Sequence, residues 1–204
     1  MDTWDTLASD QSIQTATGAL AAHGIDVRVV ENGQRAKEMV LTLLSPESEV
    51  MTMTSVTLDV IGISEEINKA NGKFRPVRDK LYAMDKETEA KEMKRLGAAP
   101  DVVIGSVHAV TEDGYVLVAS ATGSQLPAYA YSAGKVIWVV GSQKMVKNVE
   151  DGMKRIYEYV LPFEDVRAKK AYGVGSGVNK LLIISKEVIP GRITLIFVKE
   201  TLGY

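Results

Sequence analysis

A carboxylate and a hydroxyl-rich loop flank one short apolar run, and they are the residues of this chain best suited to chemistry. Glu112 comes just before the apolar run 115–119, and residues 120–125 follow it as Ser-Ala-Thr-Gly-Ser-Gln. A carboxylate at the end of a strand, partly shielded from water, could act as a nucleophile or a general base. The alternative is that Glu112 and Asp113 are exposed turn residues ahead of Gly114.

The loop 120–125 is a candidate anion-binding site. Its backbone N–H groups and hydroxyls could form a concave nest for a negatively charged ligand. An α/β protein also tends to bind its ligand where loops leave the carboxyl ends of strands. The alternative is a polar connection from strand to helix that binds nothing and ends at Pro127. The candidate binding residues are Ser120, Thr122, Gly123, Ser124 and Gln125.

A second group of hydroxyls follows the apolar run 50–53 and precedes a helical pattern. Thr54 or Ser55 should cap that helix, because a side-chain oxygen there accepts a hydrogen bond from a free N–H of the first turn. The N–H groups left exposed would suit a carboxylate or a phosphate. Capping alone also explains the pattern.

Residues 173–180 read Gly-Val-Gly-Ser-Gly-Val-Asn-Lys and suggest contact with a phosphate. The segment is not a P-loop, because Asn179 precedes the lysine. It is not a dinucleotide fingerprint either, because the pattern after it favours a strand rather than a helix. It is therefore either a flexible phosphate-contacting loop or a structural turn. The residues that the first alternative would use are Gly175, Ser176, Gly177 and Lys180.

The chain has two histidines, His23 and His108. The imidazole of His108 could shuttle protons near neutral pH, although a lone histidine among apolar residues is more often hydrogen-bonded and partly buried. His23, beside Gly24, is typical of a helix end. Their spacing does not match a metal-ligand motif, so no metal site is predicted.

Composition excludes several classes of protein. The 204 residues carry a net charge of -2, with Lys and Arg scattered among Asp and Glu, so no nucleic-acid partner is expected. The absence of cysteine excludes disulfides, thiolate zinc sites and thiolate-held iron–sulfur clusters, and we expect no cofactor. Neither a signal peptide nor an apolar run of about 20 residues is present, so we expect a cytoplasmic protein with no membrane partner.

Helical and strand patterns alternate through most of the chain. Helices are predicted over 4–22, 34–44, 56–70, 86–96 and 149–160, and strands over 25–30, 50–53, 101–105, 115–119, 135–140, 181–184 and 193–198. Asp85 is expected to cap the fourth helix, and Pro162 to follow the end of the fifth. The alternation favours an open, largely parallel sheet with helices on both faces. The last two strands, joined by Pro190-Gly191, favour an antiparallel hairpin, and the chain 1–204 is predicted to be one domain.

Four stretches resemble the LUD-domain family of lactate-utilisation proteins. Residues 54–63 are similar to that family's Ser-x-Thr-Leu-x-Glu-Ile-Gly stretch, and residues 109–114 to its Ala-Ile-Ala-Glu-Thr-Gly. The second stretch runs on along 115–126, the third comprises 136–141 and 144–146, and the fourth is the glycine-rich 173–177. Asp113 departs from it by standing where the family usually has Thr, and the 120–125 loop lacks the acidic residue and the arginine often found there.

The resemblance implies a fold similar to that of sugar isomerases, CoA transferases and formyl-tetrahydrofolate cyclo-ligases. This is a three-layer α/β/α sandwich with a mostly parallel sheet and an antiparallel C-terminal part. The resemblance also implies a link to the oxidation of lactate to pyruvate, in which separate iron–sulfur subunits carry the redox chemistry. We therefore expect an accessory or regulatory protein that binds a small anionic metabolite or partner subunits.

Two enzymatic alternatives stay open. One is a CoA or acyl transferase, or a sugar-phosphate isomerase, that uses Glu112. The other is an ATP-dependent cyclo-ligase-like activity that uses the 173–177 segment. A homo-oligomer is compatible with any of these functions. In each case we expect the acidic turn at 112–114, the 120–125 loop and the glycines to meet at one pocket on the rim of the sheet.

Overall fold

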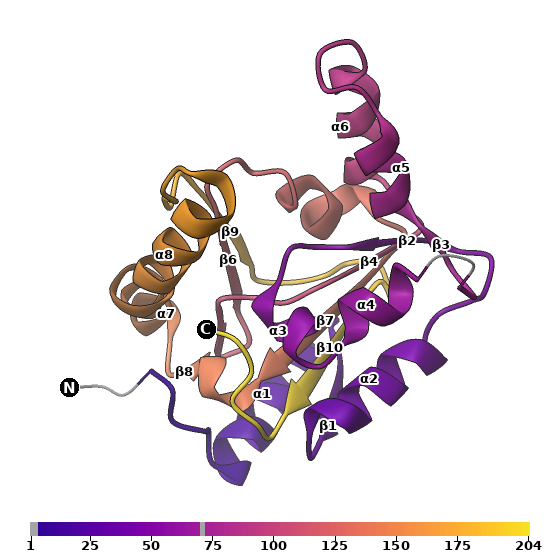
Figure 1. The fold of residues 1–204 in the computed structure, drawn as a ribbon. Coiled ribbons are helices and arrows are strands. Elements are labelled where there is room, and N and C mark those ends of the chain that lie inside the picture. Colours follow the sequence, from indigo (N-terminus) through magenta and orange to yellow (C-terminus); the bar gives the residue numbers. More distant parts are fainter. Residues whose placement is uncertain (1–3, 70–71) are drawn as a thin grey trace.

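Six parallel strands form the large sheet at the centre of the protein, in the order β1-β10-β7-β4-β2-β3 (Figure 1). The computed structural model describes residues 4–69 and 72–204. The strands are β1 (Asp26–Val30), β2 (Glu49–Thr52), β3 (Arg75–Pro76), β4 (Val102–Gly105), β7 (Lys135–Gly141) and β10 (Ile193–Val198). The parallel order confirms the α/β fold that the alternating pattern predicted.

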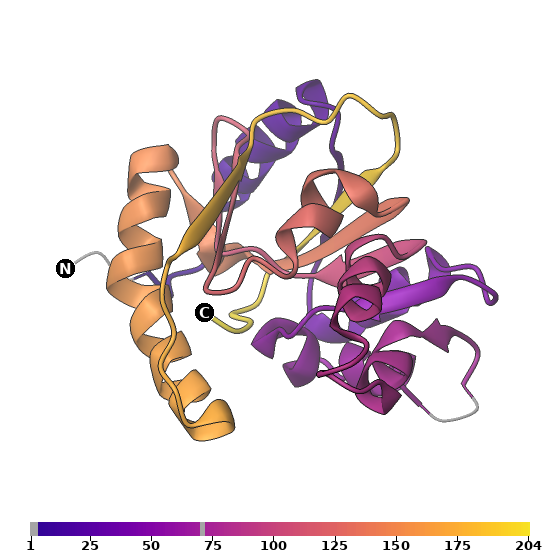
Figure 2. The same cartoon turned by 90° about the horizontal axis from the view of Figure 1, so that it is seen from above.

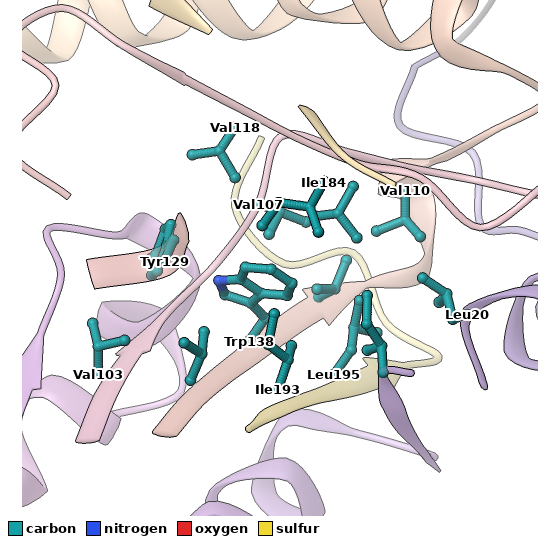
Figure 3. Close-up of a cluster of buried hydrophobic side chains, with 14 of the residues drawn as sticks. Leu20, Val103, Val107, Val110, Val118, Tyr129, Trp138, Ile184, Ile193 and Leu195 are labelled. Carbon is teal, nitrogen blue, oxygen red and sulfur yellow. The ribbon is translucent and has the colours of Figure 1, made fainter. Parts of the chain in front are cut away.

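The neighbouring interior strands β7 and β10 are apolar because both of their faces are covered. Every residue of β10 is buried, and so is every residue of β7 except Lys135. Continuous apolar runs of this kind are typical of strands in the middle of a parallel sheet. Trp138 of β7 lies fully buried among valine, leucine and isoleucine side chains, with the Tyr129 ring edge-on to it (Figure 3).

Three helices cover one face of the large sheet (Figure 1). They are α2 (Gly33–Thr42), α3 (Val56–Val60) and α4 (Ile63–Ile67). Asn32 and Ser55 cap α2 and α3 through their side-chain oxygens, so the predicted cap at Ser55 is confirmed. Val40 and Leu58 are two of the fully buried helix residues that pack on strand residues such as Val139. Burying one such side chain contributes about 1.5–3 kcal/mol.

The opposite face is covered by helix α1 (Asp10–Ala22), by the π-helical turn η1 (Ala128–Ser132) and by a second, smaller sheet. The small sheet has the order β8-β5-β6-β9 and is mixed, since β6 pairs antiparallel with both of its neighbours. Its strands are β5 (Ala109–Thr111), β6 (Val116–Ser120), β8 (Met145–Val146) and β9 (Lys180–Ile184). Its far side packs on the helical segment 149–172, so the small sheet lies between that segment and the large sheet (Figure 2).

The predicted C-terminal hairpin is wrong. β9 pairs antiparallel with β6 in the small sheet, whereas β10 lies between β1 and β7 in the large sheet and is parallel to both. The Pro190-Gly191 turn therefore carries the chain from one sheet to the other. The two strands differ in burial. β10 is buried on both faces, as expected for a strand inside a covered parallel sheet, whereas Ile183 of β9 is exposed.

The helix predicted to stop before Pro162 continues through it. The helical segment consists of α7 (Val149–Arg155), the π turn η3 (Ile156–Val160) and α8 (Leu161–Tyr172). In the π turn the Leu161 N–H bonds to Ile156 O, five residues back. Pro162 lies in the first turn of α8, directly after the π turn has changed the hydrogen-bonding pattern of the helix. Its missing N–H and fixed φ are tolerated in a first turn.

Other element boundaries differ because single residues interrupt the helical pattern. The predicted helix 56–70 is split between α3 and α4 at Gly62, whose φ is 69°. Its predicted end at Ala70, and the stop at Asn71, lie outside the described residues. Asp85 accepts a hydrogen bond from the Glu87 N–H within a turn, and α6 (Ala90–Ala98) begins later than predicted.

The predicted first helix starts late as well, and several short elements were not predicted. α1 begins at Asp10, after the cap at Ser9, rather than at Trp4. The unpredicted elements are α5 (Val77–Ala83), η1, η2 (Ser142–Lys144), β5 and β8. In the part of the chain that the structure describes, no helix is both long and apolar enough to span a bilayer.

Candidate ligand-binding pocket

A cavity of about 410 Å³ opens at the carboxyl ends of β2 and β4, which are neighbours in the large sheet. Residues 53–57 follow β2 and residues 106–108 follow β4, so this rim is where an α/β sheet commonly binds its ligand. The other walls come from the loop after β6, from Lys144, from α8 and from residues 174–178. Tyr204 closes the cavity between α3 and α8, and the C-terminus lies there in both ribbon views (Figures 1 and 2).

Most of the residues proposed from the sequence to bind a ligand line this one cavity. They are Thr54, Ser55, Ser120, Thr122, Ser124, Gln125, Gly175, Ser176 and Gly177. Two others support its loops instead: Gly123 has a φ of 85° that shapes the bend, and Lys180 Nζ donates to Thr122 O at 2.9 Å. The hydroxyl-rich loop and the glycine-rich segment are therefore brought together, as expected.

Glu112 does not line the cavity. It lies in the turn between β5 and β6, where its N–H donates to Val146 O at 2.9 Å. The same turn contacts α1, because His23 Nδ1 lies 3.0 Å from Gly114 O. β6 separates this turn from the Ser120 loop, so the two features predicted to share a pocket lie at opposite ends of one strand.

Hydrogen bonds within the 120–125 loop fix its shape. Ser120 Oγ accepts from the Gly123 N–H at 2.9 Å and donates to Gln125 Oε1 at 3.2 Å. Thr122 Oγ1 accepts from the Ser124 N–H at 3.3 Å. The polar side chains of the loop are thus held in place by one another before any ligand arrives.

The glycine-rich segment is tied to the helix that precedes it. Gly173 ends α8 with a φ of 74°, and the Ser176 N–H donates to Asp165 Oδ1 at 2.9 Å. Lys169 forms an ion pair with the same carboxylate at 2.6 Å. The segment leads directly into β9, as the strand pattern after it predicted.

Lys144 is the pocket residue to which sequence reasoning gave no role. It lies in the 3-10 turn Ser142–Lys144 directly after the central strand β7, and its side chain is 2% exposed. Nζ donates to Thr57 Oγ1 at 3.0 Å and to Ser106 Oγ at 3.1 Å. Burial, reinforced by the positive charge of Arg155, lowers the pKa of Lys144 to about 7.

No carboxylate forms an ion pair with Lys144 within residues 4–69 and 72–204. A second buried cation, Arg155, bonds to carbonyl oxygens instead: His108 O at 2.6 Å and Trp4 O at 3.3 Å. Burial lowers the pKa of Arg155 to about 10, so it keeps its charge at neutral pH. Among the described residues, these two interacting cations are therefore buried without an anion paired to them, and Lys144 is the one that lines the cavity.

His108 is neutral at physiological pH. Burial, together with the charges of Lys144 and Arg155, lowers its pKa to about 3. Its Nδ1 accepts a hydrogen bond from the Ala119 N–H at 3.0 Å, which places the ring hydrogen on Nε2. The side chain thus anchors the end of β6, and this environment favours the partly buried, hydrogen-bonded interpretation over a proton shuttle.

The opposite wall carries a carboxylate that is already paired. Glu164 of α8 accepts two hydrogen bonds from Arg167, both at 2.7 Å, and one from the Tyr204 hydroxyl at 2.6 Å. The Tyr204 ring also stacks on Phe163, with centroids 5.7 Å apart. Among the described residues, no group of three or more His, Asp or Glu side chains could hold a metal ion.

Comparison with known proteins gives a family and a fold. The family model described as the LUD domain matches residues 13–198. A solved structure, a DUF162 family protein from Deinococcus radiodurans, is similar with a TM-score of 0.60 at 11% identity, over 95% of this chain and 99% of that one. Comparison with the curated proteins gave no match.

Proposed function

Because this chain belongs to the LUD-domain family, which is related to lactate utilisation, we propose that it binds a small organic anion in the pocket at the rim of the large sheet. Its role would be that of an accessory or regulatory protein in the utilisation of lactate or related organic acids. The redox chemistry of such a system would lie with separate iron–sulfur partner subunits, since this chain has no cysteine to hold a cluster by thiolates.

The observation that carries this proposal is the surroundings of Lys144. A buried ammonium group normally has a carboxylate partner, because leaving a charge unpaired in a low-dielectric site is costly. Lys144 has two hydroxyl partners instead, and it faces a cavity rather than a packed core. A bound anion would supply the missing charge, and a hydrogen bond to a charged group contributes about 1.5–3 kcal/mol.

The anion should raise the melting temperature of the protein, and Lys144 should be required for the effect. A ligand at 100 times its Kd adds about 2.7 kcal/mol to the stability of the folded state. We would screen lactate, pyruvate, CoA and sugar phosphates by thermal shift on the wild type, on Lys144→Met and on Lys147→Met. Lys147 is an exposed neighbour, so its variant removes the same charge without touching the pocket.

We expect a shift with at least one anion in the wild type and in Lys147→Met, and none in Lys144→Met. Binding should also weaken about 100-fold between pH 6 and pH 9, because the pKa of Lys144 is about 7 and the amine loses its charge over this range. A shift of equal size in Lys144→Met, or no shift with any of these anions, would count against the proposal.

The two enzymatic alternatives stay predictions. A transferase or isomerase that uses Glu112 would need a second site, since Glu112 lies outside this pocket. The cyclo-ligase-like activity has more support, because residues 174–178 line the pocket. Adding ATP to the same thermal-shift screen tests it: without a shift at millimolar ATP, that activity can be set aside.

A further inference from the structure

We propose that the side-chain amine of Lys144 forms an imine with the carbonyl carbon of a small 2-oxo acid bound in this pocket. The inference rests on the proposed function, since the same pocket must first hold the acid. It goes beyond that function by assigning a reversible covalent bond and by restricting the ligand to an acid that carries a ketone or aldehyde group.

The hydrogen bonds around Nζ fit a neutral amine. Thr57 Oγ1 donates its own hydrogen to Leu202 O at 3.1 Å, so it can only accept from Lys144. Ser106 Oγ lies 3.1 Å from the same Nζ and takes a second hydrogen. An amine has two hydrogens and one lone pair. Both hydrogens are then engaged, and the lone pair remains available to attack a carbonyl carbon in the cavity.

The groups that surround Lys144 favour loss of its proton. Arg155 of α7 repels the ammonium form, and His108, on the segment after β4, is neutral. The carboxylates that line the cavity are those of Asp59 of α3, which is exposed, and of Glu164 of α8, which is held by Arg167 and Tyr204. A pKa of about 7 leaves about half of the Lys144 amines neutral at pH 7. An exposed lysine is neutral in only about 1 molecule in 10³.

The covalent step needs no oxidant or reductant. The nitrogen lone pair forms a bond to the carbonyl carbon, and the C=O π electrons move to the oxygen. The extra proton passes from nitrogen to that oxygen, and the hydroxyl of Ser106 can relay it, because this hydroxyl lies in hydrogen-bonding reach of Nζ. Loss of water from the carbinolamine gives C=N, so the net reaction is ketone plus amine to imine plus water.

A 2-oxo acid suits the two halves of the pocket. Its carboxylate would accept a hydrogen bond from Ser124 of the 120–125 loop, because the Ser120 and Thr122 hydroxyls donate within the loop and the Ser124 hydroxyl accepts there. Its carbonyl carbon would then lie at Lys144. The ammonium form of Lys144 attracts the acid and the amine form reacts with it. Both forms are populated near pH 7, so recognition and bond formation can share one residue.

The test is reductive trapping of the imine. Intact protein would be incubated at pH 7 with pyruvate or a longer straight-chain 2-oxo acid in the presence of cyanoborohydride, with lactate as the control that lacks a carbonyl. We expect one reduced adduct per chain, found by peptide mass spectrometry on Lys144. Lys147→Met should be labelled like the wild type, and Lys144→Arg should lose the adduct. At a low concentration of the acid, the labelling rate should be highest near pH 7 and fall on either side, because the amine form reacts and the ammonium form binds the acid.

The outcomes separate this inference from the proposed function. A thermal shift with pyruvate and lactate, but without any adduct, would overturn the imine and leave anion binding intact. Labelling spread evenly over the exposed lysines would also overturn it. If Lys144→Arg fails to fold, Ser106→Ala keeps the amine and should slow labelling several-fold, and an unchanged rate would speak against the hydroxyl relay and the step proposed here.

Discussion

The Glu187–Arg192 pair and the Lys144 site both bury a cation, but only the first region supplies an opposite charge. Arg192 Nε and Nη2 lie 2.7 and 2.6 Å from Glu187 Oε2, and Nη2 also donates to Tyr129 O at 2.8 Å. Lys144, which is at least as buried, has two hydroxyls and a cavity around its amine.

The difference distinguishes a structural charge from a functional one. A buried ion pair satisfies itself and holds two segments together, here the end of the β9–β10 connection and η1. A buried cation without a counterion costs free energy in the empty protein, and a strongly shifted pKa in a cavity marks a candidate functional site. We therefore assign the first region to stability and propose the second for ligand binding.

The largest expected effect is at the ion pair. Glu187→Gln leaves Arg192 buried without its counter-charge, which should lower the free energy of unfolding by about 3–5 kcal/mol. Glu31→Gln is the matched control, because Glu31 pairs with Lys199 at the surface and should cost less than about 1 kcal/mol. Urea unfolding at pH 7 measures both. Equal losses in the two variants would remove the distinction between the regions.

The Lys144 site should respond to pH in a way that the ion pair does not. The folded-state pKa of Lys144 lies below its ordinary value of 10.5, so the unfolded chain holds a proton that the folded chain releases. Stability must then rise with pH across this window. Between pH 7 and pH 9 the wild type should gain about 2 kcal/mol relative to Lys144→Met.

Urea unfolding at the two pH values, with Lys147→Met as the control, measures this gain. The control should follow the wild type, because Lys147 is exposed and its replacement leaves the amine of Lys144 and its surroundings unchanged. If the wild type and Lys144→Met change in parallel, the amine of Lys144 keeps its proton in the folded state, and the contrast with Arg192 disappears.

The smallest effect should come from a carboxylate that belongs to neither region. Glu112→Gln should change the free energy of unfolding by no more than about 0.5 kcal/mol. It should also leave the ligand-induced thermal shift unchanged, because Glu112 does not line the pocket. A loss of that shift would show that the β5–β6 turn is coupled to the pocket after all.

Local features of the fold were predictable from the sequence. The turn at Gly24, the cap at Ser55 and the buried strand β7 depend on residue type and near neighbours, and all three are confirmed. The two polar loops of the pocket were found for the same reason, since small and hydroxyl residues after an apolar run are visible in one dimension.

Partner choice was not predictable in the same way. β9 and β10 have similar apolar patterns and a turn between them, yet they join different sheets, because burial on both faces is decided by neighbours that are distant in sequence. Pro162 predicts the end of a helix, but the π turn before it, which no residue pattern reveals, lets the helix continue.

By itself, the sequence determined the alternation of helices and strands, the caps and turns, and the absence of thiolate chemistry, because these depend on residue types and short spacings. Only the tertiary structure decided that Glu112 lies away from the pocket and that Lys144 is buried within it. A lysine after a strand looks the same in a sequence whether it is solvated or enclosed. Its chemistry depends on desolvation and on which charges surround it, and folding alone assembles those.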